Sequence, residues 1–147
     1  MTTVAFDGCT LAADSKSVDT HGLCDKVPKL FDTGALLVAG AGTYDNILNW
    51  VDWIKRQDSE ILFSVQKHMD ACSGIVIVKA SGSCYKLSGK RLVRISRRFH
   101  AIGSGRDYAL AAMHLGKNAV EAVKIASLFD NDTDDMVDSH HLIFGEK

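Results

Sequence analysis

Thr2, which follows Met1, has the side chain of an N-terminal nucleophile. A threonine hydroxyl is a poor nucleophile and needs a base within hydrogen-bond reach. Removal of Met1 would free an α-amine with a pKa of roughly 7.7–8.0, whereas a lysine amine titrates at about 10.4. Near neutral pH the α-amine therefore supplies far more neutral base than a lysine does. We expect the amine of Thr2 to act as the general base for its own hydroxyl.

Two charged residues downstream, Asp14 and Lys26, are the candidates that tune this amine. An ammonium group close to the α-amine lowers the pKa of that amine, because one positive charge disfavours a second one nearby. A carboxylate beside the lysine keeps the lysine charged and oriented. The trio works only if the fold brings Asp14 and Lys26 next to Thr2, which depends on the strands that carry them.

The first strands are predicted to form a tight hairpin. Thr2–Phe6 is rich in residues that favour strands, Asp7-Gly8 is a dipeptide that type I′ turns favour, and Cys9–Asp14 continues as an extended segment. A turn centred there pairs residues whose numbers sum to about 15. Thr2 is then expected opposite Ala13, beside the last residue of the second strand.

A second reversal, at Asp19–His21, is predicted to bring Gly22–Val27 back along the second strand. The numbers of paired residues then sum to about 40, which places Lys26 opposite Asp14. Neighbouring strands lie about 4.8 Å apart, so Thr2, Asp14 and Lys26 are expected in adjacent rows of one sheet.

The rest of the chain groups strands with strands and helices with helices. Helices are predicted from Tyr44 onward, over Ile61–Met69, from Asp107 to Leu115 and over Ala119–Phe129, and further strands over Ala35–Ala39, Gly74–Lys79, Ser83–Leu87, Arg91–Ile95, Phe99–Ile102 and Met136–Ile143. Because no βαβ alternation occurs, the sheets should be largely antiparallel with helices outside them. We expect a single α+β domain over residues 1–147, built as a four-layer αββα sandwich.

Composition excludes several classes of protein. Hydrophobic residues make up 46% of the 147 residues and there is one proline, so a packed core is expected. The net charge of −1 gives no electrostatic drive toward nucleic acid or an anionic membrane, and the apolar runs are too short to span a bilayer. Four scattered cysteines and no signal-peptide pattern predict free, buried thiols and a cytoplasmic location.

Two charged stretches have simpler interpretations than binding. Asp130, Asp132 and Asp134 match the opening of a calcium loop, but Asp135 and His141 stand where that loop needs glycine and glutamate. A solvated acidic turn is the preferred interpretation and a weak cation contact the alternative, so no metal or cofactor is expected. The basic stretch 90–98 is interpreted as an exposed strand face, with steering of an acidic partner as the alternative.

Six short motifs in order resemble those of one family. They are Met1–Val4, Ala12–Ser15, Asp25–Val27, Ala39–Gly42, Ala101–Gly105 and Asp130–Thr133. Their order and spacing resemble the proteolytic β-type subunits of the proteasome and the HslV peptidase, which are N-terminal nucleophile (Ntn) hydrolases. Each motif alone is weak, but together they cover nearly the whole chain.

The resemblance implies a role for each matching residue. Thr2 would be the nucleophile and its amine the base, tuned by Asp14 and Lys26. Three further residues would hold the amine and a water in place: Ser104, Asp130 and Thr133. A backbone N–H of Gly40 or of Gly42 would stabilise the oxyanion, and the sequence leaves both open.

The resemblance also implies an activity and an assembly. We expect a threonine peptidase that cuts unfolded polypeptides through an acyl-enzyme, works as a homo-oligomeric ring and receives substrate from an ATP-dependent unfoldase. Two alternatives stay open. One is an amidase that uses the same chemistry on small substrates, and the other is a non-catalytic ring or scaffold subunit that keeps Met1.

Overall fold

The computed structural model describes residues 2–18, 22, 24–56, 72–88 and 91–142. Its helices are α1 (Tyr44–Arg56), α3 (Arg106–His114) and α4 (Ala119–Phe129). Its strands are β1 (Thr3–Phe6), β2 (Thr10–Asp14), β3 (Lys16–Val18), β4 (Cys24–Lys26), β5 (Leu30–Asp32), β6 (Leu36–Gly42), β7 (Cys72–Val78), β8 (Ser83–Ser88), β9 (Arg91–Ile95), β10 (His100–Gly103) and β11 (Val137–His141).

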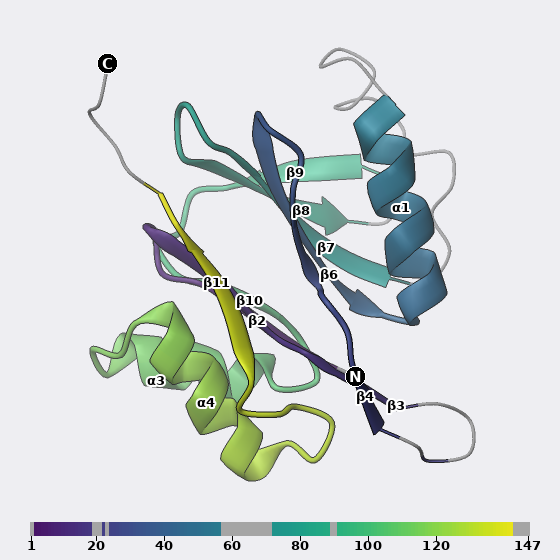
Figure 1. Ribbon diagram of the computed structural model, residues 1–147. Coiled ribbons are helices and arrows are strands. Elements are labelled where there is room, and N and C mark those ends of the chain that lie inside the picture. The colour runs from purple at the N-terminus through teal and green to yellow at the C-terminus, as the bar shows by residue number, and fades with distance from the viewer. Residues whose placement is uncertain (1, 19–21, 23, 57–71, 89–90, 143–147) are drawn as a thin grey trace.

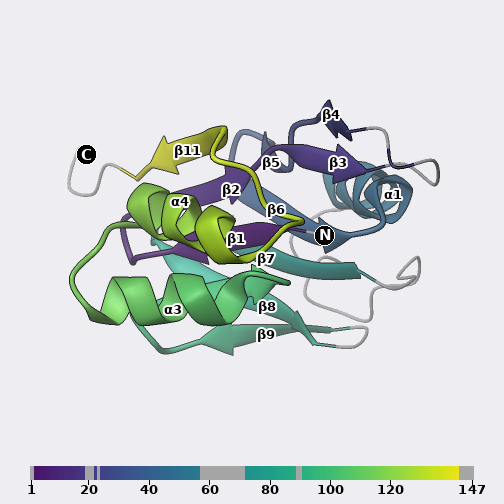
Figure 2. The ribbon, with the colours of Figure 1, turned by 90° about the horizontal axis from the view of Figure 1, so that it is seen from below.

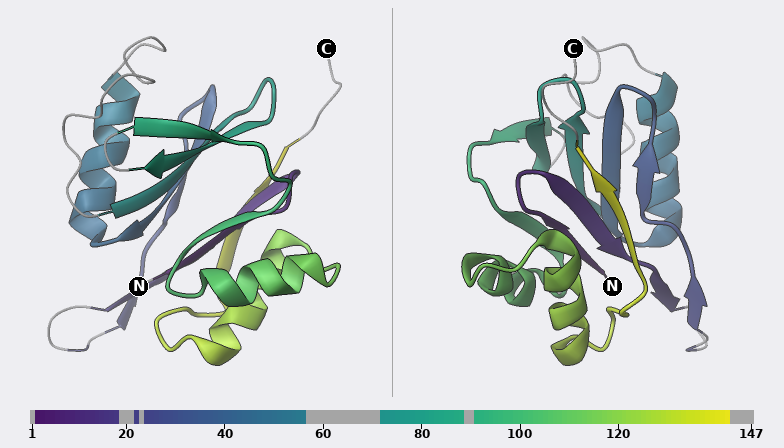
Figure 3. Two further views of the ribbon diagram at one scale, coloured as in Figure 1. Left: turned by 180° about the vertical axis from the view of Figure 1, so that it is seen from behind. Right: turned by 60° about the vertical axis from the view of Figure 1, so that its left-hand side comes forward.

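These elements form four layers, as Figure 1 shows. One sheet has the strand order β10-β1-β2-β11, the other has the order β5-β6-β7-β8-β9, and β3 pairs with β4 in a small ribbon. All the strand pairs are antiparallel. Helix α1 covers the outer face of the five-stranded sheet, and α3 and α4 cover the outer face of the four-stranded sheet (Figures 1 and 3). The predicted αββα sandwich is confirmed.

Strand β1 contributes to two of the three interior layers because its side chains alternate between faces. Val4 and Phe6 pack between the two sheets, whereas Ala5 packs under α3 and α4. The layer under these helices is built largely from alanines, so the helices lie close to the backbone of β1 and β2. This close packing holds the first residues of β1, which begin the candidate site, against α4.

The other helix, α1, packs through an apolar stripe centred on Trp50, which is fully buried. Its indole ring lies over Gly74 of β7. A Cβ atom built on Gly74 would lie 2.1 Å from the ring, far inside van der Waals contact. The absence of a side chain at this position is therefore a packing requirement of α1.

Replacing Gly74 with alanine is expected to lower the free energy of unfolding by about 1–3 kcal/mol, because the indole of Trp50 must move in a close-packed layer. Thermal or denaturant melts of the variant would measure the loss. Ser73→Ala, at the exposed neighbouring position, is the matched control and should melt as the wild type does. An unchanged melting temperature for Gly74→Ala would contradict the close contact.

Several sequence-based expectations need correction. Val4, not Thr2, lies opposite Ala13, because the carboxylate of Asp7 accepts the backbone N–H groups of Cys9 and Thr10 and so lengthens the turn. The shift is by two residues, an even number, so each side chain keeps its predicted face.

The sixth strand extends to Gly42, beyond the predicted end at Ala39, and the last strand is shorter than predicted, at Val137–His141. The predicted helix Ile61–Met69 lies outside the described residues. The predicted free thiols are found at Cys9, Cys24 and Cys84, but only Cys84 is buried. Among the described helices, none is long and apolar enough to cross a bilayer.

Candidate active site

Thr2 lies directly before β1, with 1% of its surface exposed. Its backbone N–H donates to the hydroxyl of Ser104, with 3.2 Å between the two atoms, and its carbonyl accepts from the N–H of Gly105 at 3.4 Å. Gly103, at φ +95°, makes room for this carbonyl, since a Cβ there would lie 1.9 Å from the oxygen. The turn between β10 and α3 therefore holds the backbone of Thr2 in place.

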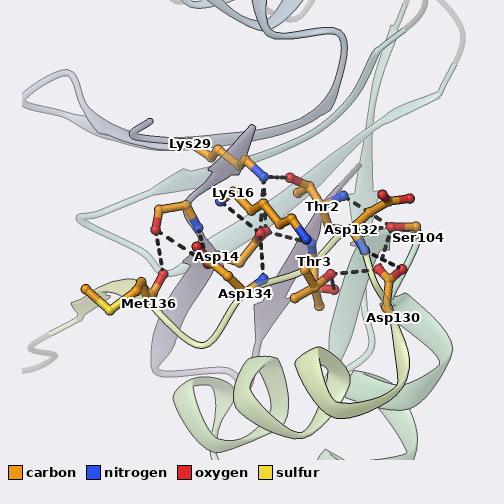
Figure 4. Close-up of polar contacts among 12 residues, drawn as sticks. Thr2, Thr3, Asp14, Lys16, Lys29, Ser104, Asp130, Asp132, Asp134 and Met136 are labelled. Carbon is orange, nitrogen blue, oxygen red and sulfur yellow. Dashed lines mark hydrogen bonds and ion pairs between the residues drawn. The ribbon is translucent and has the colours of Figure 1, made fainter. Parts of the chain in front are cut away.

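The side chain of Thr2 contacts a lysine, Lys29, as Figure 4 shows. The ammonium group of Lys29 donates to the hydroxyl oxygen of Thr2 and lies 3.2 and 3.3 Å from the two carboxylate oxygens of Asp14. Lys29 is 3% exposed and Asp14 is fully buried. One buried ammonium group thus joins the hydroxyl of Thr2 to the carboxylate.

Asp14 is held by three backbone N–H groups in addition to Lys29. The N–H of Thr3 donates to one carboxylate oxygen at 2.9 Å, and the N–H groups of Lys16 and Asp134 donate to the other at 3.2 and 3.3 Å. A buried carboxylate is tolerated when its oxygens accept several such bonds. The carboxylate is therefore fixed independently of the lysine that it orients.

Lys26, the lysine predicted from the sequence, does not lie in this cluster. It is exposed on β4 and pairs with Lys16 of β3, not with Asp14. Next along the ribbon, the N–H of Val27 donates to the carbonyl of Ser15, with 2.8 Å between the atoms. The pairing ends there because the following residue, Pro28, has no N–H to donate. The chain then turns toward the sheets, and Lys29 takes the place predicted for Lys26.

Burial lowers the pKa of Lys29, because removal from water disfavours the charged amine. The negative charge of Asp14 and its hydrogen bond oppose this shift, and Asp134 and Asp130 oppose it more weakly. The lysine consequently holds its proton less firmly than a surface lysine while it remains paired with a carboxylate.

A second group of polar side chains lies on the other side of Thr2. Asp130, which follows α4, accepts hydrogen bonds from Ser104 at 2.6 Å and from Thr133 at 2.7 Å, both on the same oxygen. Burial by itself raises the pKa of Asp130, but the bonds from Ser104, Thr133 and the N–H of Asp132 outweigh it and hold the pKa below its ordinary value. An ionised Asp130 therefore anchors the hydroxyl that receives the Thr2 N–H.

The lowered pKa of Asp130 predicts an acid-dependent loss of stability. A carboxyl group with a depressed pKa in the folded state stabilises the protein above its unfolded pKa of 3.8, and this contribution disappears as the pH falls through the folded pKa. The melting temperature of the wild type is expected to exceed that of Asp130→Asn at pH 6, and the difference should shrink below pH 4. Melts of both proteins between pH 7 and 3 would test this, and a constant difference would contradict it.

Comparison with solved structures finds other proteins with the same fold as this chain. BPH of Thiobacillus denitrificans superposes with a TM-score of 0.69 at 18% identity, over 97% of this chain and 98% of that chain. The same protein in complex with epoxomicin gives 0.69 at 17% identity, with the same coverage. The eukaryotic HslV of Trypanosoma brucei gives 0.66 at 16% identity, over 95% and 97% of the two chains.

This chain has the proteasome/HslV-type Ntn-hydrolase fold. Comparisons with protein-family models and with curated proteins gave no match. At 16–18% identity the superpositions show the fold, and the chemistry has to be argued from this chain's own residues.

In this Ntn-hydrolase fold, the two glycines whose N–H groups were proposed to stabilise the oxyanion differ in their contacts. The N–H of Gly40 already donates to the carbonyl of Lys29 at 3.2 Å. Gly40 also has a packing role, since a Cβ there would lie 2.8 Å from Ile47 of α1. Gly42, at φ +129°, has the conformational freedom that glycine provides and remains the candidate of the two.

The predicted residues Thr2, Asp14, Ser104, Asp130 and Thr133 lie together, and the prediction missed Lys29 and Thr3. A signal for Lys29 exists in the sequence, since it stands between Pro28 and the apolar pair Leu30-Phe31. A lysine flanked by apolar residues is a candidate for burial, and buried lysines need a partner.

Proposed function

We propose that this chain is a threonine-type endopeptidase that hydrolyses unfolded polypeptides through an acyl-enzyme on Thr2. The observation that carries the proposal is the contact of one buried ammonium group, on Lys29, with both the hydroxyl of Thr2 and the carboxylate of Asp14. A buried ammonium group needs a partner for its charge, and this one also contacts the hydroxyl proposed as the nucleophile. BPH has the same fold as this chain, and its structure is known in complex with epoxomicin. This complex supports a ligand-binding site in a protein of this fold.

In the proposed reaction the free α-amine of Thr2 takes the proton of its own hydroxyl as the oxygen attacks the substrate carbonyl. The charge that develops on the Thr2 oxygen is stabilised by the ammonium of Lys29, and that on the substrate oxygen by the N–H of Gly42. The amine then passes its proton to the leaving nitrogen, which leaves an ester on Thr2. A water activated by the same amine hydrolyses the ester and restores the site.

The roles of Ser104 and Asp130 follow from which group donates and which accepts in their hydrogen bonds. The hydroxyl of Ser104 donates its one proton to Asp130, so its oxygen accepts from the nitrogen of Thr2. An α-amine bound in this way uses an N–H toward Ser104 and keeps its lone pair for the Thr2 proton. Cleavage after Met1 is required, because an amide nitrogen has no basic lone pair.

We further propose a homo-oligomeric ring in the cytoplasm that is served by an ATP-dependent unfoldase. The aromatic rings of Tyr108 and Phe129 stack with their centroids 5.3 Å apart, yet they are 43% and 63% exposed, and Leu128, which precedes Phe129 in α4, is 76% exposed. Exposed apolar side chains such as the stacked pair favour contact with a second copy. The free thiols of Cys9, Cys24 and Cys84 favour a reducing compartment.

Three measurements on the purified protein test the proposed function. Intact-mass spectrometry should find Thr2 at the N-terminus. An unfolded protein and a fluorogenic peptide should both be hydrolysed, and epoxomicin should block both reactions. Turnover of small amides alone would support the amidase, and retained Met1 with no turnover would support a scaffold subunit and overturn the proposal.

A further inference from the structure

The residue after the proposed nucleophile, Thr3, is fully buried and makes two polar contacts with the site (Figure 4). Its backbone N–H donates to Asp14 at 2.9 Å. Its hydroxyl oxygen lies 2.7 Å from the hydroxyl oxygen of Thr133. Thr3 therefore touches both polar groups that flank Thr2, through one atom of its backbone and one of its side chain.

The direction of the bond between the two hydroxyls follows from counting protons. A hydroxyl has one proton to donate and two lone pairs that accept. Thr133 uses its proton on the carboxylate of Asp130, with 2.7 Å between the oxygens, and an ionised carboxylate has no proton to return. Thr3 must then be the donor to Thr133.

The local backbone is built to admit this hydroxyl. A Cβ at Gly105 would lie 2.0 Å from the side-chain oxygen of Thr3. The first residue of the turn, Gly103, likewise leaves space for the carbonyl of Thr2. The two glycines on either side of Ser104 therefore leave room in the β10–α3 turn for the carbonyl of Thr2 and the hydroxyl of Thr3. Figure 2 shows β1 next to α4, on the side where the N-terminus lies.

We propose that Thr3 is a positioning residue of the active site: its hydroxyl donates to Thr133, which directs the Thr133 proton to Asp130 and so keeps Ser104 aligned to receive the nitrogen of Thr2. Thr3 thus donates to Thr133, and Thr133 donates to the carboxylate of Asp130. The same carboxylate also accepts a hydrogen bond from the hydroxyl of Ser104. The kinetic part of this inference rests on the proposed function, whereas the bond itself does not.

Thr3→Val removes the hydroxyl and keeps the shape of the side chain, and Thr3→Ser keeps the hydroxyl. For the valine variant we expect kcat to fall about 10-fold with KM changed less than about two-fold, because the base is misplaced while substrate binding is untouched. The serine variant should recover kcat to within about three-fold. Thr10→Val, at the far end of β2, is the control and should match the wild type.

A double-mutant cycle separates positioning from a general loss of packing. If Thr3 acts through Thr133, then Thr3→Val should have no further effect on kcat in a Thr133→Val background. Additive losses in the double variant would overturn the proposal, and so would an unchanged kcat in Thr3→Val.

A second readout does not depend on catalysis. Without Thr3 as donor, the Thr133 hydroxyl is free to turn away from Asp130, so the pKa of Asp130, followed by NMR of its carboxyl carbon, should rise in Thr3→Val and stay as in the wild type in Thr10→Val. An unchanged pKa of Asp130 would overturn the inferred bond. An inactive wild type with the expected pKa change would instead refute the proposed function and leave the bond between Thr3 and Thr133 supported.

Discussion

Replacing Lys29 with methionine is expected to lower kcat/KM for peptide hydrolysis by about 1,000-fold, whereas Lys26→Met should leave it within about two-fold of the wild type. The two lysines are three positions apart, and the motif Asp25–Val27 pointed to Lys26. Only the ammonium of Lys29 contacts the hydroxyl of Thr2, and Lys26 is exposed on β4. Initial rates of the two variants measure the difference directly.

Stability has to be followed together with activity in this experiment. Removal of one partner of a buried ion pair costs about 3–5 kcal/mol, because the remaining charge loses its compensation. Asp14 keeps three backbone donors, which limits the loss. The double variant Lys29→Met with Asp14→Asn removes both charges but should not regain the lost stability, because both carboxylate oxygens of Asp14 accept backbone N–H groups and an amide nitrogen cannot accept. A folded Lys29→Met protein with wild-type activity would exclude Lys29 from the mechanism and leave Lys26 to be reconsidered.

Thr2→Ala is expected to abolish hydrolysis to below about a thousandth of the wild-type rate, because it removes the hydroxyl that contacts the ammonium of Lys29 and forms the proposed ester. Thr2→Ser should retain measurable turnover, since it keeps the hydroxyl and the α-amine. Both variants should fold, because the backbone bonds of Thr2 to Ser104 and Gly105 do not involve its side chain. Peptide turnover and intact mass on the same samples are the measurements.

Thr10→Ala serves as the matched control, because it also removes a threonine side chain from this hairpin but at the end far from Lys29. Loss of activity in Thr10→Ala would point to a general effect on the hairpin. Activity in a Thr2→Ala protein from which Met1 has been removed would rule out the proposed nucleophile. Wild-type activity found only in preparations that retain Met1 would argue against the amine as base.

The sequence predicted the class of fold well because its signals are local or periodic. The alternation in β1 sends Val4 and Phe6 between the sheets, and the apolar stripe around Trp50 defines one face of α1. Neither depends on knowing which strands become neighbours. The order of strands and helices then leaves few ways to bury these faces, and the four-layer sandwich is one of them.

The sequence was less able to predict register, since register depends on the geometry of two turns. The carboxylate of Asp7 lengthened the first turn, and this moved the pairing by two residues. Pro28 ends the pairing of β4 with β3, and Lys29, the residue after it, lies in the site. A pattern of residue types contains no information about such shifts, which are fixed only when the strands pack against the rest of the core.

Short motifs of the sequence pointed to five candidates, because such motifs preserve residue type and order along the chain: Thr2, Asp14, Ser104, Asp130 and Thr133. The packed fold was needed to see that Lys29 rather than Lys26 contacts Thr2, and that the N–H of Gly40 already donates to a carbonyl. The contact of Thr3 with Thr133 likewise appears only in the fold. The motifs could not reveal these contacts, because the contacts join residues up to 130 positions apart in the chain. Their distances and bond directions are set by how the β10–α3 turn, α4 and two hairpins pack around one buried carboxylate.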